Sequence, residues 1–354
     1  MGLVFVQGVN NNMTSSQLTH FIRKVFLKST NNLSWLKKGD KVMLKPALNS
    51  PDPYPATTHP LSVKVVFDLL KARRADVFIA DQSGVEHVVN NEQGIVRGSS
   101  LECFKKSGMW FKGANFIPIE STDWEKDYFN FKAPSWNFHI TKLIKQADHI
   151  INLPRLSTHS QAGVTLGLKS IVGLLREDSR LDFHNNGPFN FGIKGYTKET
   201  GLAVPDDKSG LFFEKMTEIM LAVKDKLRVT LFTATKANVS FGPDKSLLGL
   251  FKSGVAKPRT GLVFASNDLL SAEVFALSFL KSLYSCSSFT NKFWEKFLLF
   301  CNGSAKELSK ECVWTNPFIK HALKIGLGKK ELKVEYNNVP EELKNELNNI
   351  SACD

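Results

Sequence analysis

Short apolar runs that alternate with longer amphipathic stretches constrain the fold of this chain more than any other feature. The runs "KVMLK" at 41–45, "DVFIA" at 76–80 and "HIINL" at 149–153 each have the length and composition of a buried strand. A stretch near 60–73 repeats apolar residues at helical spacing and has Pro60 in its first turn. The alternation predicts a three-layer α/β fold, in which a mostly parallel sheet containing these three strands is flanked by helices.

The same alternation extends over the rest of the chain. Thr14 and Ser15 are capping candidates for a first helix. Further strands are expected at 3–7, 229–233 and 262–265, and helices at 15–29, about 209–226 and about 268–284, with mainly helical sequence up to 328.

Two polar segments are expected to lack regular structure. The segment around 176–208 is predicted as a polar loop, and the polar, Asn-rich residues at the C-terminus are expected to fray. We therefore predict one α/β unit over 1–328 followed by a polar tail over 329–354. A division of the unit into two lobes near 176–208 stays open.

The charge of the chain favours an anionic ligand. Lys and Arg number 46 against 34 Asp and Glu, which gives a formal net charge of +12 among 354 residues. The basic clusters are short, separated and not interleaved with aromatic residues, so they are typical of solvated faces rather than of a nucleic-acid groove. A small anionic ligand is therefore the expected partner, nucleic acid is not, and the oligomeric state stays open.

Cysteine usage is typical of a reducing compartment. No two of the five cysteines have C-x-x-C spacing, which argues against a zinc ribbon and against an iron–sulfur cluster. We expect reduced thiols and no disulfide, with Cys286, Cys301 and Cys312 as buried hydrophobic residues on helices. No apolar run reaches the roughly 18 residues of a membrane span, and the N-terminus lacks the basic region of a signal peptide. The prediction is a soluble, cytoplasmic protein without a membrane partner.

Polar side chains follow three of the predicted parallel strands. Lys45 closes one strand, Asp81 follows another, and Arg155 and His159 follow a third. Ligands of open α/β sheets lie outside the carboxyl ends of the strands. The predicted site is Lys45, Asp81, Arg155, His159 and Lys169 in one cavity, with His87 and His184 at its rim.

The segment "LPRLSTHSQAGVTLGLKSIVGLL" at 153–175 is the most distinctive part of the chain. It places Lys169 ten residues after His159, without any carboxylate from 149 to 176. A buried ammonium there must reach water, meet an anionic ligand or lose its proton. His159 is a proton acceptor or metal ligand in one interpretation, and in the other it only caps the residues that follow. A phosphate-binding P-loop is excluded, because Leu168 separates the lysine from the preceding glycine.

In their order along the chain, several motifs resemble the family known as domain of unknown function 362. They are "VMLKPAL" (42–48), "TTHP" (57–60), "VFIADQSG" (77–84), "ADHIINLPRLSTHSQAGVTLGLKSIVGLL" (147–175), "FGP" (241–243), "GLVFASNDLLSAEVFA" (261–276) and "NPF…ALKIGLG" (316–328). Where the family usually has a lysine, this chain has Arg155. Glu273 matches the second acid of a family pattern, and the iron–sulfur cysteines of many relatives are absent.

The central motif is also distantly similar to the cofactor-binding domain of nickel-pincer lactate racemases. That resemblance implies that Lys169 would hold a cofactor, that His159 or His184 would ligate a metal or move protons, and that His87 would be a further catalytic histidine. It places Lys45 where those enzymes grip substrate. The glycine pair that precedes the racemase lysine is absent here.

These observations together predict an enzyme, an oxidoreductase or an isomerase, that acts on a small carboxylate or phosphate by proton or hydride transfer. Lys45, Asp81 and Arg155 would bind the substrate. The cofactor is unknown, and a bound metal or a nucleotide-derived cofactor both stay open. The alternative is a non-catalytic, ligand-binding or cofactor-binding accessory protein of a redox pathway.

Overall fold

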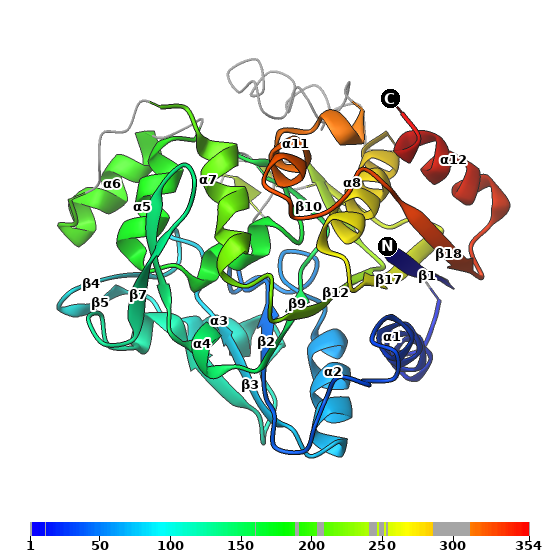
Figure 1. The fold of residues 1–354 in the computed structure, drawn as a ribbon, viewed down its shortest axis with the longest axis horizontal. Helices are drawn as coiled ribbons and strands as arrows, with labels where there is room; N and C mark the ends of the chain where they lie inside the picture. Colours follow the sequence, from blue (N-terminus) through cyan, green and yellow to red (C-terminus); the bar gives the residue numbers. More distant parts are fainter. Residues whose placement is uncertain are drawn as a thin grey trace.

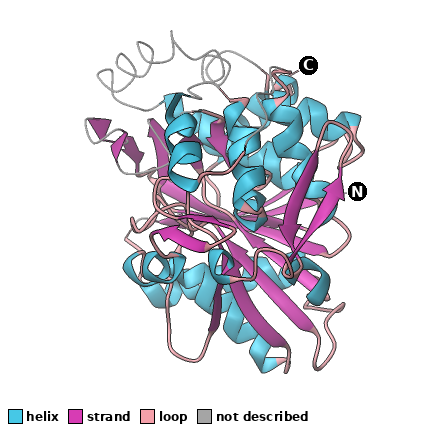
Figure 2. Cartoon of the chain, turned by 90° about the vertical axis from the view of Figure 1, so that its left-hand side faces the viewer, coloured by secondary structure: helices cyan, strands magenta, loops and turns pink. Residues whose placement is uncertain are grey.

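A central sheet with helices on both faces organises the molecule (Figures 1 and 2). The computed structural model describes residues 2–10, 12–159, 161–187, 191–203, 209–240, 246–247, 251–252, 254–285 and 312–353. Within these residues the sheet has eight strands, in the order β18 (Lys333–Asn337), β1 (Leu3–Asn10), β17 (Thr260–Ser266), β12 (Leu227–Ala234), β9 (His149–Leu153), β2 (Lys41–Pro46), β3 (Asp76–Asp81) and β6 (Asn115–Pro118).

Most neighbouring strands of this sheet are parallel. Only β17 runs antiparallel to both of its neighbours, β1 and β12, among the described strands of the sheet. The three strands that the sequence predicts to be parallel, β9, β2 and β3, lie side by side and are parallel. The predicted three-layer, mostly parallel α/β fold is therefore confirmed.

Alternate residues of each central strand enter opposite cores. Val42 and Leu44 of β2 and Ile151 of β9 pack toward α1 (Ser15–Ser29) and α2 (Pro60–Ala72). Met43 and Ile150 point to the other face, which α8 (Leu269–Ser285) helps to cover. Because side chains of a strand alternate between its faces, continuous apolar runs of this kind need a helical layer on each side.

The predicted N-terminal ends of the first two helices are confirmed. Thr14 caps α1 through a capping box with Gln17. His59 caps α2, its Nδ1 accepting the N–H of Leu61 at 3.2 Å, and Pro60 takes the first helical position.

Shorter elements complete the described chain. They are β4 (Val89–Asn91), β5 (Gly94–Arg97), α3 (Ser100–Lys106), η1 (Ile119–Ser121), β7 (Tyr128–Lys132), β8 (Asn137–Thr141), α4 (Leu143–Gln146), β10 (Ser157–His159), β11 (Gly163–Thr165), η2 (Lys169–Leu174), β13 (Ala237–Ser240), β14 (Ser246–Leu247), β15 (Phe251–Lys252) and β16 (Gly254–Ala256), where η marks a 3-10 helix. Strands β11, β10, β13 and β16 form a small second sheet.

The expected loop around 176–208 is wrong over much of its length. It contains α5 (Glu177–Asn185) and α6 (Phe191–Thr200). Helix α5 is polar but largely buried. Its Glu177 and Arg180 can be buried because they form an ion pair of 2.9 Å with each other. The helix expected at about 209–226 is shorter, with α7 (Phe212–Glu218) continuing into η3 (Ile219–Ala222).

The C-terminal residues do not fray, which corrects a second expectation. Strand β18 pairs in parallel with β1, so the two ends of the described chain lie together in the sheet (Figure 1). Helix α12 (Glu341–Ser351) packs against α8. The sequence could not show this pairing, because the two strands are separated by more than 300 residues.

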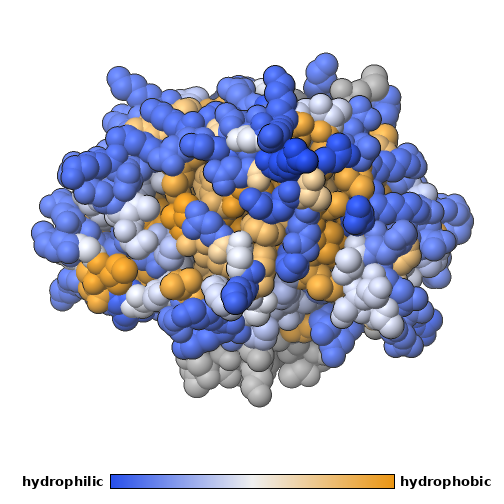
Figure 3. Space-filling model, turned by 90° about the horizontal axis from the view of Figure 1, so that it is seen from below, coloured by the Kyte–Doolittle hydropathy of each residue, from blue (hydrophilic) through white to orange (hydrophobic). Residues whose placement is uncertain are grey.

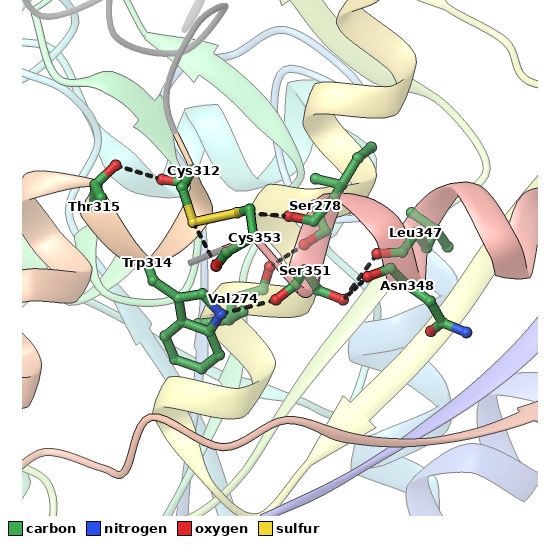
Figure 4. The surroundings of a disulfide bond; sticks show 10 residues. Val274, Ser278, Cys312, Trp314, Thr315, Leu347, Asn348, Ser351 and Cys353 are labelled. Carbon is green, nitrogen blue, oxygen red and sulfur yellow. Dashed lines mark hydrogen bonds between the residues drawn. A yellow bond between two sulfur atoms is a disulfide. The ribbon is translucent and has the colours of Figure 1, made fainter.

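A disulfide joins Cys312 to Cys353 and fastens the end of α12, as Figure 4 shows. The expectation that the chain has no disulfide is therefore wrong, since two cysteines 41 residues apart meet only in the folded chain. Cys312 does not lie within a helix but precedes η4 (Val313–Thr315) and α11 (Pro317–Lys324). Cys286 and Cys301 lie outside the described residues.

Figure 3 shows one face of the molecule. Hydrophilic residues surround this face, and hydrophobic residues gather toward its middle. None of the helices among the described residues has the length and apolarity needed to span a bilayer.

Candidate functional site at the strand ends

The carboxyl ends of β2, β3 and β9 meet at one edge of the sheet, because the three strands are parallel and adjacent. Lys45 is the next-to-last residue of β2, and Asp81 is the last residue of β3. The chain after β9 continues through Arg155 to β10. Lys45 and Asp81, two of the residues predicted from strand ends, are therefore neighbours in space.

Lys45 and Asp81 bind each other. Lys45 Nζ lies 2.8 Å from Asp81 Oδ1 and donates to Pro46 O at 2.6 Å, and the lysine is completely buried. The Asp81 carboxylate also accepts the N–H groups of Leu48 and Gln82, each at 2.8 Å. Burial lowers the pKa of Lys45 and raises that of Asp81, and their mutual attraction opposes both changes. The two charges are neutralised inside the fold.

A second buried ion pair extends this polar cluster. Arg180 pairs with Glu177 and donates to the carbonyl oxygen of Ser83, and Gln82 Nε2 donates to Glu177 Oε2 at 2.9 Å. Burial raises the pKa of Glu177 to about 7. Five buried atoms in this region have no hydrogen-bond partner among the described residues, which is typical of groups that bind internal water. They are Gln82 Oε1, Ser83 Oγ, Glu120 Oε2, Glu177 Oε1 and Arg180 Nε.

His159 ends β10 and caps the hairpin that leads into β11. Its Nδ1 accepts the N–H groups of Gln161 at 3.1 Å and Ala162 at 3.2 Å. Gly163 then returns the chain with φ +73°, a conformation that favours glycine. A neutral histidine whose Nδ1 accepts hydrogen bonds carries its proton on Nε2. His159 is therefore a hydrogen-bond donor at Nε2, and the capping contact foreseen from the sequence is present.

His184 has the opposite ring arrangement. It lies in the last turn of α5 rather than on the loop expected from the sequence, and its Nδ1 is 2.6 Å from Arg180 O. Since a carbonyl oxygen only accepts, Nδ1 carries the proton and Nε2 keeps its lone pair. His184 can thus accept a proton or bind a metal through Nε2.

The charge of Lys169 acts on both of these histidines. It begins η2, and like His159 and His184 it retains 8% of its surface exposed. Burial is the largest cause that lowers the pKa of both histidines well below the usual range, followed in each case by the charge of Lys169. His184 also acts on His159, as does Arg155, which donates to Ala56 O. Lys169, His184 and Arg155 are thus close enough to His159 to act on it electrostatically, and a shared cavity stays a prediction.

His87 is half-buried in the turn after β3, where its N–H donates to Gly84 O at 2.8 Å. Its place at the rim of the site stays a prediction, as does the cavity itself. Within the described ranges, no group of three or more His, Cys, Asp or Glu side chains could hold a metal ion.

Two buried polar residues next to Lys169 are missing from the sequence-based site. Asn152 lies in β9, and its Nδ2 donates to Gly167 O at 3.0 Å. Glu273 lies in α8, and its Oε2 accepts the N–H of Leu168 at 3.0 Å. Each had a signal in the sequence, since Asn152 interrupts the apolar run of β9 and Glu273 is the one carboxylate in the largely apolar sequence of α8. Only the fold shows that both contact the same turn.

A family model described as "domain of unknown function (DUF362)" matches residues 42–278, which is more than half of the chain. The chain belongs to this family. The DUF362 match covers both ion pairs, the two histidines, Lys169 and Glu273. The chain is also 27% identical over 147 residues to a protein of Synechocystis sp. named as thylakoid-associated. That match covers 40% of each protein, so the chain matches less than half the length of this relative.

Proposed function

We propose that this DUF362 protein is an enzyme that moves a proton on a small anionic molecule at the site formed by His159, His184 and Lys169. The observation that carries the proposal is that two neutral histidines of opposite tautomer share one electrostatic environment with a lysine. Structural histidines need no such complementarity. An enzyme that both accepts a proton and stabilises negative charge on an oxygen does need it.

The roles follow from the ring nitrogens. His184 Nε2 has the lone pair and would accept the proton, which it later returns to the product. His159 would donate its Nε2–H to the substrate oxygen on which negative charge develops, as a neutral imidazole can when positive charge keeps its pKa low. Lys169 and Arg155 supply the positive charge that attracts a carboxylate or phosphate.

Lys45 and Asp81 have a supporting role in this proposal, because each already neutralises the other. The distant similarity to nickel-pincer lactate racemases suggests hydride transfer as a variant of the same chemistry. A bound cofactor like that of the racemases would supply the hydride acceptor that the protein's own side chains lack. His184 Nε2 is the ring atom suited to contact it, and no step of the proposal depends on it.

Variants of Lys169 test the proposal. D-lactate and L-lactate in ²H₂O are the first probes, with chiral analysis for interconversion and NMR for exchange at C2. Inorganic phosphate and each lactate enantiomer are titrated by calorimetry. Lys169→Ala should remove turnover and anion binding, and Lys169→Arg should fail almost as badly because a guanidinium keeps the charge but has another shape. A fully active Lys169→Arg enzyme would show that a positive charge of either shape suffices at this position, and a fully active Lys169→Ala enzyme would refute the proposed role of Lys169.

Two variants of His159 separate catalysis from capping. In His159→Asn, Oδ1 takes the place of Nδ1 and can still accept the Gln161 and Ala162 amides, but the Nε2–H is lost. In His159→Gln, the donor is kept approximately in place while the cap is lost. We expect the Asn variant to be folded and inactive. A folded and fully active Asn variant would leave His159 with capping alone.

The accessory-protein alternative gives a different pattern. It predicts that the wild-type protein binds an anion without interconverting D-lactate and L-lactate or exchanging the hydrogen at C2. In that case Lys169→Ala weakens binding only. Metal analysis and intact mass of gently purified protein decide whether a cofactor accompanies the chain.

A further inference from the structure

The turn that carries Lys169 is held on one side by Asn152. We name residues Gly167–Ser170 the lysine turn. Asn152 Nδ2 donates to Gly167 O at 3.0 Å, while Ser170 Oγ lies 2.7 Å from Asn152 Oδ1 and 2.8 Å from Gly167 O. Asn152 is completely buried. The backbone before Lys169 and the side chain after it are thus tied to the end of β9.

Glu273 of α8 holds the other side of the lysine turn. Its Oε2 accepts the N–H of Leu168, and a Cβ added to Gly167 would lie 2.9 Å from the same oxygen. The carboxyl group therefore lies directly on the turn and leaves no room for a side chain at Gly167. Burial raises the pKa of Glu273 to about 8, although the hydrogen bonds from Leu168 and Gly167 lower it. The carboxyl group is therefore mostly protonated at pH 7.

An acid at this place is costly for the fold. The residues around Glu273 in α8, such as Ala272 and Val274, are apolar and buried, and an apolar side chain here would avoid the desolvation of a carboxyl group. It would also leave the Leu168 N–H without its acceptor inside the protein. The carboxyl group is therefore best explained by what it does to the lysine turn.

We propose that Glu273 is a positioning residue, which clamps the lysine turn against Asn152 and thereby keeps the Lys169 side chain beside His159 and His184. This inference rests on the proposed function of Lys169. It assigns to α8 control over where the positive charge of the site lies.

The two histidines report the position of Lys169 without any ligand. Because the charge of Lys169 lowers the pKa of both rings, its displacement should raise both values. The measurement is ¹⁵N NMR of the imidazole rings during titration of the full chain. Lys169→Met defines the complete effect. Glu273→Met, which lacks an acceptor, should raise both pKa values by about 0.5 to 1. Glu273→Gln keeps an oxygen that can accept the Leu168 N–H, and its side chain is also uncharged. It should therefore leave the pKa values of both rings near those of the wild type.

Ser278→Ala is the matched control, since Ser278 is buried in the same helix and donates only to Val274 O at 2.9 Å. It should leave the rings unchanged. A folded Glu273→Met protein with wild-type ring pKa values overturns the clamp. Where Glu273→Met does not fold, Glu273→Asp withdraws the carboxyl by one methylene and must give a smaller rise, and no rise again overturns it.

A calorimetric titration with inorganic phosphate separates this inference from the proposed function. If Glu273→Met raises the ring pKa values and weakens phosphate binding about tenfold or more, both are supported. If the ring values rise while wild-type and Lys169→Met proteins bind phosphate equally, the clamp holds and the anion-binding role of Lys169 fails.

Discussion

Replacing Lys45 with methionine tests whether the Lys45–Asp81 pair supports the fold or binds a ligand. Methionine is nearly as long as lysine and apolar, so the change removes the charge and little volume. The Asp81 carboxylate then stays buried without Lys45. It still accepts the N–H groups of Leu48 and Gln82. An uncompensated buried charge is strongly destabilising.

The size of the loss follows from the cheaper of two routes. Asp81 either stays charged or takes up a proton. Protonating a carboxyl of ordinary pKa 3.8 at pH 7 costs at most about 4 kcal/mol, at roughly 1.4 kcal/mol per pKa unit. Breaking a buried ion pair on one side costs about 3–5 kcal/mol, which agrees. We therefore expect Lys45→Met to lower the free energy of unfolding by about 3–4 kcal/mol at pH 7, and by less at pH 5, where protonation is easier.

Urea unfolding at both pH values measures this loss. The double variant Lys45→Met with Asp81→Asn should recover much of it, since no charge is then left buried. Lys64→Met is the control, because Lys64 pairs with Asp68 on the surface, where an ion pair contributes about 1 kcal/mol or less. A Lys45→Met protein that has wild-type stability but no longer binds phosphate would refute this reasoning. Lys45 would then be a ligand-binding residue, as predicted from the sequence.

Three further changes give independent tests. Gly173→Ala would place a Cβ 1.9 Å from Asp81 Oδ1, so we expect a loss of about 1–3 kcal/mol in urea unfolding, and an unchanged midpoint would contradict the packing. Cys353→Ser opens the bridge to Cys312, whose separation of 41 residues corresponds to about 4 kcal/mol of chain entropy, and titration of denatured, non-reduced wild-type protein should find at most three thiols. Glu273→Gln should gain stability relative to wild type as the pH rises toward 9, because a carboxyl whose pKa is raised from 4.5 to about 8 stabilises the fold fully below pH 4.5 and loses this contribution through pH 8. Parallel unfolding curves of the two proteins from pH 5 to 9 would contradict that pKa.

The parts of the fold that could be predicted from the sequence are those whose signal is local. The strands β2, β3 and β9 are continuous apolar runs between helices, so their type and parallel direction follow from the alternation of strand and helix patterns. The capping box at Thr14 and Pro60 at the start of α2 are equally local. Because parallel strands end at one edge, the meeting of Lys45 with Asp81 was also within reach, although their pairing with each other was not.

The missed features depend on contacts between distant segments. Helix α5 has no strong apolar face, and the buried Glu177–Arg180 pair that stabilises it requires the neighbouring cluster. Strand β18 gains its hydrogen bonds from β1 at the other end of the chain, and Cys312 meets Cys353 only through α12. In each case tertiary contact overrides a polar local sequence.

The buried ion pairs contact one end of η2 and of α5, and Lys169 and His184 lie at the other ends of these two elements. Gly173, late in η2, packs on Asp81, whereas Lys169 begins η2. Arg180 lies in the buried cluster, whereas His184, one turn later in α5, donates to the carbonyl oxygen of Arg180. The neutralised cluster thus anchors one end of η2 and one end of α5, and the other ends present the lysine and the histidine. Rigid support of this kind is what a preorganised site requires. It follows that a variant in the anchoring cluster should lose stability before it loses ligand affinity, and that a variant of Lys169 or His184 should do the reverse.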